Sequence, residues 1–361
     1  MKTKIIPNIF ISVAVFFALT GLLAADKLQP TFTTFDAPGA VNTFCVAINP
    51  AGVIAGGYTD ANNLLHGFMR AKDGTFTTYE APGAGTGPGQ GTGPNGMNSE
   101  GDVTGNVTDA SNVTHGYVRA KDGTITNFDA PGATVAFGTV GFGINPAGVI
   151  AGIWGDSNMI HGFVRAKDGT ITEFDPPGSI ATFMSEHGCI NPAGFIVGVY
   201  FDAGFVPHGF VRAPDGTITT FDAPGAGTGL FQGTGANCIN PAGTIDGGFT
   251  DSSNANHCFV RDADGTFTTF DVPGAGTAPN QGPLPLGVNP RGSISGESLD
   301  TSNVWHGFVR GLNGVITTFD VPGAGTAPGQ GTQCGSINPA GATTGSYIDS
   351  NNVFHGFLRT P

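Results

Sequence analysis

Short strand-like runs that mix apolar and polar residues recur along the chain, and turn sequences separate them. In one such run, His-Gly-Phe-x-Arg, the His, Phe and Arg lie two positions apart, so their side chains share one face of a strand. The separating sequences include Asn-Pro-Ala-Gly and Lys-Asp-Gly, in which Pro presets φ and Gly or Asp accepts a left-handed conformation. The pattern predicts a protein built from β-strands.

The His-Gly-Phe-x-Arg run belongs to a larger repeated unit. It occurs seven times, with Tyr117 replacing the Phe in one copy and Cys258 replacing the Gly in another. Each unit contains four predicted strands: one ending at an Ile-Asn pair such as Ile48-Asn49, a second over 53–59 and its equivalents, the His-Gly-Phe-x-Arg run, and a Thr-Ile/Phe-Thr-x-Phe run. Four strands in roughly 48 residues is typical of β-propeller blades. A β-solenoid is the alternative, but its coils are usually shorter.

The two ends of the repeat region each hold an incomplete unit. Residues 31–36 (TFTTFD) form a fourth strand with none before it, and residues 355–359 form a third strand with none after it. If these ends meet, the N-terminal strand completes the last blade and no open sheet edge remains. We therefore expect an all-β fold, a seven-bladed β-propeller of four-stranded blades, closed by the N-terminal strand.

The first 25 residues have the pattern of a secretory signal peptide. Lys2 and Lys4 precede an apolar run over 9–23, and small residues follow at Ala24 and Ala25. A membrane anchor is the alternative, but the run is shorter than the roughly 20 residues that a span needs. We expect a signal peptide over 1–25, a single propeller domain over 26–361, and a secreted, extracellular or periplasmic protein without a later membrane span.

The charge balance excludes one class of partner. Removal of Lys2 and Lys4 from the 14 basic residues leaves 12 against 27 acidic ones. A chain this acidic repels nucleic acid, so we expect no nucleic-acid partner. The sequence does not indicate self-association, and a monomer is expected.

The repeat resembles that of the extracellular HAF-repeat proteins, which share a short His-small-Phe element beside an Ile-Asn-x-x-Gly turn. Here these elements are His66-Gly67-Phe68 and Ile48-Asn49-Pro50-Ala51-Gly52, and the likeness covers residues 31–361. One unit departs from the pattern, with Met97-Asn98-Ser99-Glu100-Gly101 at the turn. The resemblance implies secretion and a repeat fold, and it implies no particular activity.

Each unit carries an Asp, a His and an Arg that together resemble an acid/base site. Because an enzyme needs one such site and not seven, we expect a structural Asp–His–Arg network that pins each hairpin and pairs its charges. The Asp-x-x-Asn turns are an alternative calcium site, since oxygen ligands suit that ion, but they equally fit Asx-turns. The expectation is therefore no cofactor. The network comprises Asp60, His66, Arg70, Asp109, His115, Arg119, Asp156, His161, Arg165, Asp202, His208, Arg212, Asp251, His257, Arg261, Asp300, His306, Arg310, Asp349, His355 and Arg359.

Four units have long Gly-rich connectors after the fourth strand. Such connectors would crown one face of a propeller, and amides beside aromatic rings suit sugar hydroxyls. The candidate ligand-binding residues are Gln90, Gln232, Gln281, Gln330, Phe231 and Trp305. Plain Gly-rich spacers are the alternative. The connectors lack the Lys-Ser or Lys-Thr of a phosphate loop, so nucleotide binding is rejected.

Departures from the repeat are the places where a specific function would be added. Glu186 and His187 form an acid and base pair outside the repeat, and Glu297 replaces a Gly, Ser or apolar residue, so these three are the weak catalytic candidates. Trp154 is assigned to the core. The spacing also allows disulfides Cys45–Cys334 and Cys189–Cys238, and Cys258 would have no partner.

Taken together, the residues indicate a secreted binding or surface-interaction module whose ligand is a glycan or an extracellular protein. The alternatives are an extracellular glycan lyase or hydrolase that uses Glu186, His187 or Glu297, and a purely structural repeat protein.

Overall fold

The structure, a computed structural model, describes residues 29–134, 137–185 and 188–361. Within these ranges all regular structure is β-strand, and the elements run from β1 to β28. No helix of the length and apolar character needed to cross a bilayer occurs in the described ranges. The predicted signal peptide over 1–25 lies outside the described residues.

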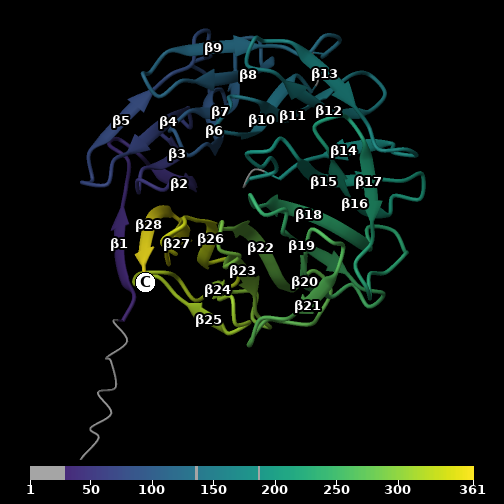
Figure 1. Cartoon of the computed structure of the whole chain (residues 1–361). Coiled ribbons are helices and arrows are strands. Elements are labelled where there is room, and N and C mark those ends of the chain that lie inside the picture. The colour runs from purple at the N-terminus through teal and green to yellow at the C-terminus, as the bar shows by residue number, and fades with distance from the viewer. Residues whose placement is uncertain (1–28, 135–136, 186–187) are drawn as a thin grey trace, which may run out of the picture.

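The strands form four-stranded antiparallel units, which we number 1 to 7 in the order of their first strands. The first strands, which lie nearest the centre in Figure 1, are β2 (Asn42–Ile48), β6 (Gly91–Met97), β10 (Thr139–Ile144), β14 (Ala181–Phe183), β18 (Gly233–Ile239), β22 (Gly282–Val288) and β26 (Gly331–Ile337). The second strands are β3 (Ile54–Thr59), β7 (Val103–Thr108), β11 (Ile150–Gly155), β15 (Ile196–Phe201), β19 (Ile245–Thr250), β23 (Ile294–Leu299) and β27 (Thr343–Ile348). The third strands are β4 (Leu65–Arg70), β8 (Thr114–Arg119), β12 (Ile160–Arg165), β16 (Pro207–Arg212), β20 (Asn256–Arg261), β24 (Trp305–Arg310) and β28 (Phe354–Thr360). The fourth and outermost strands are β5 (Phe76–Tyr79), β9 (Ile125–Phe128), β13 (Ile171–Phe174), β17 (Ile218–Phe221), β21 (Phe267–Phe270), β25 (Ile316–Phe319) and β1 (Thr31–Phe35).

The fourth strand of unit 7 is β1, from the other end of the chain. It pairs antiparallel with β28, with Thr31 opposite Thr360 and Phe35 opposite Gly356. The pairing that the incomplete ends predict is therefore present. Figure 1 shows the units arranged around a common centre, with β1 and β28 side by side.

The third strand of each unit forms the core. Its Phe, or Tyr117 in unit 2, is completely buried, as is the first Ile of the second strand in most units. Full burial of one such side chain contributes about 1.5–3 kcal/mol. In unit 1 the Gly before the Phe allows a close approach, because a Cβ on Gly67 would lie 2.5 Å from the ring of Tyr79 in the adjacent strand. Unit 5 has Cys258 at this position. In the repeated Gly-Phe pair, the Phe ring thus packs in the core, and the Gly leaves room for the aromatic ring of the fourth strand to pack against the backbone.

Neighbouring units are linked by the Asn of the Ile-Asn turn. Its Oδ1 accepts backbone N–H groups of its own turn, as Asn240 does from Ala242 and Thr244. Its Nδ2 donates to the backbone carbonyl of the equivalent Asn in the next unit, as Asn240 does to Asn289. The donor distances are 3.0 Å for Asn98 to Asn145, 3.4 Å for Asn145 to Asn191, 3.2 Å for Asn191 to Asn240, 3.2 Å for Asn240 to Asn289, 3.1 Å for Asn289 to Asn338 and 3.4 Å for Asn338 to Asn49. The last of these joins unit 7 to unit 1.

Candidate binding site

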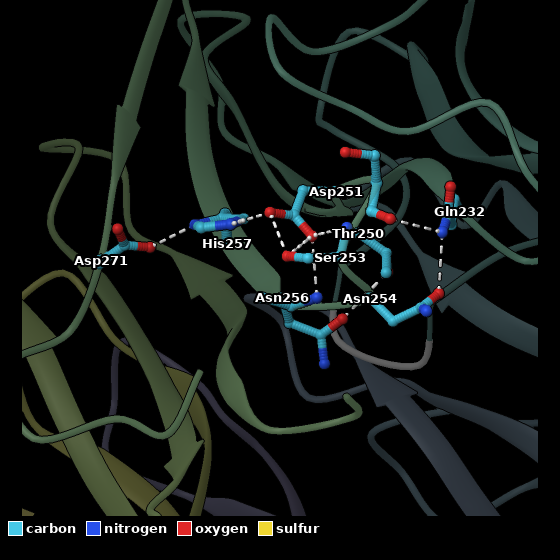
Figure 2. Close-up of polar contacts among 10 residues, drawn as sticks. Gln232, Thr250, Asp251, Ser253, Asn254, Asn256, His257 and Asp271 are labelled. Carbon is cyan, nitrogen blue, oxygen red and sulfur yellow. Dashed lines mark hydrogen bonds and ion pairs between the residues drawn. The ribbon is translucent and has the colours of Figure 1, made fainter. Parts of the chain in front are cut away.

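In each unit the repeat His lies between two carboxylates. Figure 2 shows unit 5, where the Nδ1 atom of His257 lies 2.7 Å from Asp271 and the Nε2 atom lies 3.5 Å from Asp251. The corresponding distance to the first Asp is 3.5–3.8 Å in all seven units. In five units the His ring also stacks on an aromatic residue of the second strand, as His161 does on Trp154 at 4.5 Å. The His therefore joins the second, third and fourth strands.

The sequence prediction missed the second of these carboxylates. It is the acid that follows the fourth strand, namely Asp36, Glu80, Asp129, Asp175, Asp222, Asp271 or Asp320. The signal was present in the sequence, because a Phe-Asp or Tyr-Glu pair stands at the end of all seven fourth strands.

The predicted place of the arginines is wrong. Each repeat Arg lies over an aromatic ring in the fourth strand of the preceding unit, and not beside the Asp or His of its own unit. Since the Arg lies four residues beyond the His on the same strand, it reaches past the hairpin to the neighbouring sheet. The distances from Cζ to the ring centroid are 4.4 Å for Arg70 and Phe35, 4.9 Å for Arg119 and Tyr79, 4.8 Å for Arg165 and Phe128, 5.0 Å for Arg212 and Phe174, 4.8 Å for Arg261 and Phe221, 4.9 Å for Arg310 and Phe270, and 4.9 Å for Arg359 and Phe319.

The Asp-x-x-Asn turns use their carboxylate oxygens internally. Asp60 Oδ1 accepts the backbone N–H groups of Asn62 and Leu64. The N–H of Leu64 is the main cause that lowers the pKa of Asp60, and in Asp251 the Ser253 hydroxyl lowers the pKa to about 2. One group of residues with metal-ligand geometry occurs in the described ranges, formed by His161, Glu173 and Asp175. It is the repeat His–acid pair with one added carboxylate.

The four connector glutamines make hydrogen bonds within their own units, and their role in ligand binding stays a prediction. Their Oε1 atoms accept backbone N–H groups inside the connector, and their Nε2 atoms donate to an Asn in a turn of the same unit. The donor distances are 2.9 Å for Gln90 to Asn112 and 3.0 Å for Gln232 to Asn254, Gln281 to Asn303 and Gln330 to Asn352. Figure 2 shows the contact in unit 5. These amides hold the long connectors against the turns.

Phe231, another predicted ligand residue, is exposed and lies beside a second exposed ring. Its exposed fraction is 60% and that of Phe205 is 49%, and their ring centroids are 6.2 Å apart. Both have positive φ, 60° and 56°, where the equivalent turns and connectors of other units have Asn or Gly. A bulky residue in this conformation is strained, and such strain gathers at functional positions. Leu230, 62% exposed, extends the apolar surface.

Trp305, also predicted to bind ligand, lines a cavity of about 260 Å³ between units 4, 5 and 6. The walls include Pro207, Leu284 and Leu299, and the polar lining includes Asn256 and Asn280. Among the described residues no hydrogen bond is made by the Trp305 indole, by the Asn256 Nδ2 or by the Asn280 amide, while Asn256 Oδ1 accepts from Thr250. Donors and an indole ring are thus available at one concave site. Pro207 and Gly233, both lining residues, each lie two positions after one of the exposed rings.

The three weak catalytic candidates are not brought together. Glu186 and His187 lie outside the described residues. Glu297 is in the middle of β23, opposite Leu284 and Gly307, and only 7% of it is exposed. Burial raises the pKa of its carboxyl to about 8. It lines a separate cavity on the inner strands of units 1, 6 and 7.

The five cysteines are all buried, and none forms a disulfide in the described part of the chain. The two pairings that the sequence allowed are therefore not made here. Burial raises the thiol pKa of Cys45, Cys189 and Cys334 to about 12, so these side chains behave as small apolar groups.

Comparisons with known proteins bear on the fold. No protein-family model matches the chain, and no curated protein matches it either. Among solved structures, it is similar to a streptogramin B lyase (14% identity, 92% of this chain and 98% of that one, TM-score 0.57). It is also similar to a catalytically inactive virginiamycin B lyase from Staphylococcus aureus with quinupristin (16% identity, 92% and 100%, TM-score 0.58) and to the β-propeller domain of the trilobed protease from Pyrococcus furiosus (10% identity, 88% and 95%, TM-score 0.52). At these identities the likeness shows the fold alone: the chain is a β-propeller.

Proposed function

We propose that this chain is a secreted, closed seven-bladed β-propeller that binds neutral glycans in the cavity beside Trp305. The observation that carries the proposal is the presence of an indole and unpartnered amide donors at one concave site. The proposed secretion rests on the signal-peptide pattern of residues 1–25 and on the resemblance to HAF-repeat proteins, and a monomer is proposed with it.

Three contacts between the chain's ends support closure. The strand β1 pairs with β28, Asn338 donates to the Asn49 carbonyl, and Arg70 stacks on Phe35. Each repeats a contact found within the chain, so unit 7 meets unit 1 as other units meet their neighbours.

The cavity suits a sugar ring in three respects. An aromatic face packs against the apolar face of a sugar, and the amide groups of Asn256 and Asn280 match its hydroxyls. The volume of about 260 Å³ lies just below the range of about 300–1,000 Å³ for small-ligand sites, which suits a single sugar ring. The acidic balance of the chain repels acidic glycans, which favours neutral ones.

The exposed surface formed by Phe205, Leu230 and Phe231 favours a second candidate, an extracellular protein ligand bound on the same face. For the lyase or hydrolase alternative, Glu297 is the one catalytic candidate that lies within the described residues, because Glu186 and His187 lie outside them.

A glycan array followed by calorimetry tests the proposal. We expect W305A and N280G to weaken binding of a neutral glycan by about tenfold or more, the equivalent of about 1.4 kcal/mol. N280G is the safer variant, because Gly89 and Gly329 occupy the equivalent connector position in other units. T114A, at the position of Trp305 in unit 2, is the matched control and should bind normally. An empty array with folded protein would refute glycan binding, and a pull-down that captures a protein ligand would then favour the second candidate.

A further inference from the structure

The cavity around Glu297 is distinct from the one beside Trp305, and the two share no lining residue. Its volume is about 250 Å³. The lining includes Glu297 and Leu286 of unit 6, Gln333 and Ser346 of unit 7, and the rings of Phe44 and Phe354. The strands that carry Leu286, Gln333 and Phe44 are first strands, which lie nearest the centre in Figure 1.

Glu297 is a buried carboxyl without a partner. No hydrogen bond or ion pair to it occurs among the described residues, and the equivalent positions of other units hold Gly57, Asn106, Ile153, Val199, Gly248 and Ser346. The seven repeat arginines are stacked on aromatic rings, so none of them neutralises it. A buried carboxylate is costly unless something pairs with it. A ligand that supplies the missing charge would remove that cost.

The remaining lining defines what kind of cation fits. The Gln333 amide makes no hydrogen bond with a described residue, so its oxygen is a second acceptor beside the carboxylate. The rings of Phe44 and Phe354 lie with centroids 5.0 Å apart, and aromatic rings attract organic cations. Calcium needs about 6–8 oxygen ligands, more than this lining offers. We propose that this cavity binds a primary alkylammonium group, with Glu297 and Gln333 accepting its N–H bonds and the two rings enclosing its alkyl chain.

Binding at this site is coupled to a proton. Without a ligand, burial holds the Glu297 pKa at about 8, so the carboxyl is largely protonated at neutral pH. An ammonium ion binds the carboxylate, and the carboxyl proton is released to solvent. The Cys45 thiol lines the same cavity and the Cys334 thiol lies on the neighbouring strand β26, and burial raises both pKa values to about 12, so both stay protonated. The paired strand β24 carries His306, which lies between Asp300 and Asp320, and Arg310, which stacks on Phe270. Affinity should therefore rise by about tenfold per pH unit below pH 8 and level off above it.

The test is calorimetric titration of the intact chain with butylammonium chloride at pH 6 and pH 9, with tetramethylammonium chloride and sodium chloride as comparison ligands. We expect butylammonium to bind more tightly at pH 9 than at pH 6, and E297Q to lose at least about tenfold in affinity at pH 9. Titration at pH 7 in two buffers of different ionisation enthalpy should show release of about one proton, which E297Q abolishes.

Two variants control for charge and shape. E100Q removes an exposed carboxylate in the turn between β6 and β7 and should bind as the unaltered chain does. F44L keeps an apolar side chain and should weaken binding a few-fold through loss of one ring. The proposal is overturned if butylammonium fails to bind at pH 9, if sodium or tetramethylammonium binds equally well, or if E297Q retains full affinity. None of these outcomes depends on glycan binding, so the two proposals stand or fall separately.

Discussion

The guanidinium of Arg70 lies 4.4 Å from the centroid of the Phe35 ring, so unit 1 stacks on the strand that completes unit 7. Arg70 is buried, and its Nε and Nη1 atoms have no hydrogen-bond partner in the described part of the chain. A desolvated guanidinium over a ring gains more than an exposed one, up to about 2 kcal/mol.

This contact predicts a specific dependence on Arg. R70K should lower the free energy of unfolding by about 1–2 kcal/mol, because an ammonium does not stack on a ring as a planar guanidinium does. F35A should cost about 2–4 kcal/mol. Chemical denaturation measures both, and the double variant should show coupling of about 0.5–1 kcal/mol. T33A, an exposed position on the same strand, is the control. Purely additive effects of R70K and F35A would contradict the contact.

The Asn contact between units predicts that N240A lowers the free energy of unfolding more than a substitution at an ordinary turn Asn does. N240A removes one donor to Asn289 and the acceptor for two backbone N–H groups, and Asn240 is buried. We expect a loss of about 2–3 kcal/mol in unfolding free energy. N351A is the comparison, because Asn351 is exposed and its amide bonds only to Asp349 in its own turn. Hydrogen exchange should quicken at the junction of units 5 and 6 before it does so elsewhere. Equal losses in the two variants would argue against a role for Asn240 between units.

The strained rings predict a gain in stability and a loss in binding. F205N and F231G restore the residue types that other units use at positive φ. Because the two side chains are 49% and 60% exposed, little buried area is lost, and we expect each variant to be more stable by about 1 kcal/mol. Thermal unfolding measures the gain, and the array measures any loss on the same face. A drop in unfolding temperature would show that the rings stabilise the fold instead.

Two buried carboxyls predict a decline in stability as the pH rises. Burial raises the pKa of Asp246 to about 7 and that of Glu297 to about 8, from 3.8 and 4.5. Between the ordinary and the raised pKa of each carboxyl, the folded chain binds more protons than the unfolded chain. The free energy of unfolding therefore falls as the pH rises through this range. The turn aspartates act in the opposite sense: their pKa values are lowered, so their contribution is lost as the pH falls through the acid range. The stability optimum should therefore be mildly acidic.

Denaturation at pH 5 and pH 8.5 tests this dependence. D246N and E297Q should each flatten the decline, because neither amide releases a proton, while E100Q should leave it unchanged. A decline of unchanged size in the D246N/E297Q double variant would show that other groups cause it.

The sequence predicted the strands and their grouping because those depend on local patterns. The His-Gly-Phe-x-Arg run recurs between turn sequences, and the incomplete ends pointed to the pairing of β1 with β28. Contacts inside one hairpin were also accessible, since the first Asp and the His of each unit do meet.

Contacts between units were not accessible. Arg165 stacks on Phe128, in the preceding unit, and nothing in the local spacing separates that partner from Asp156. The hydrogen bonds of the connector glutamines were not accessible either, because long Gly-rich segments suggest exposed tips, whereas each amide bonds back to a turn. Trp305 was singled out from its residue type, but Asn256 and Asn280 became visible only once the fold placed three units around one cavity.

The six Asn contacts described above run in one direction, since the Asn of each of units 2 to 6 donates to the next unit and that of unit 7 donates to unit 1. These six junctions resemble those of a head-to-tail assembly of like subunits, in which one contact recurs from subunit to subunit. A change elsewhere on a unit then leaves its junctions intact. Phe205, Phe231 and Glu297 all lie at positions that these Asn contacts do not use, which explains how an otherwise uniform chain tolerates specialised residues in a few units.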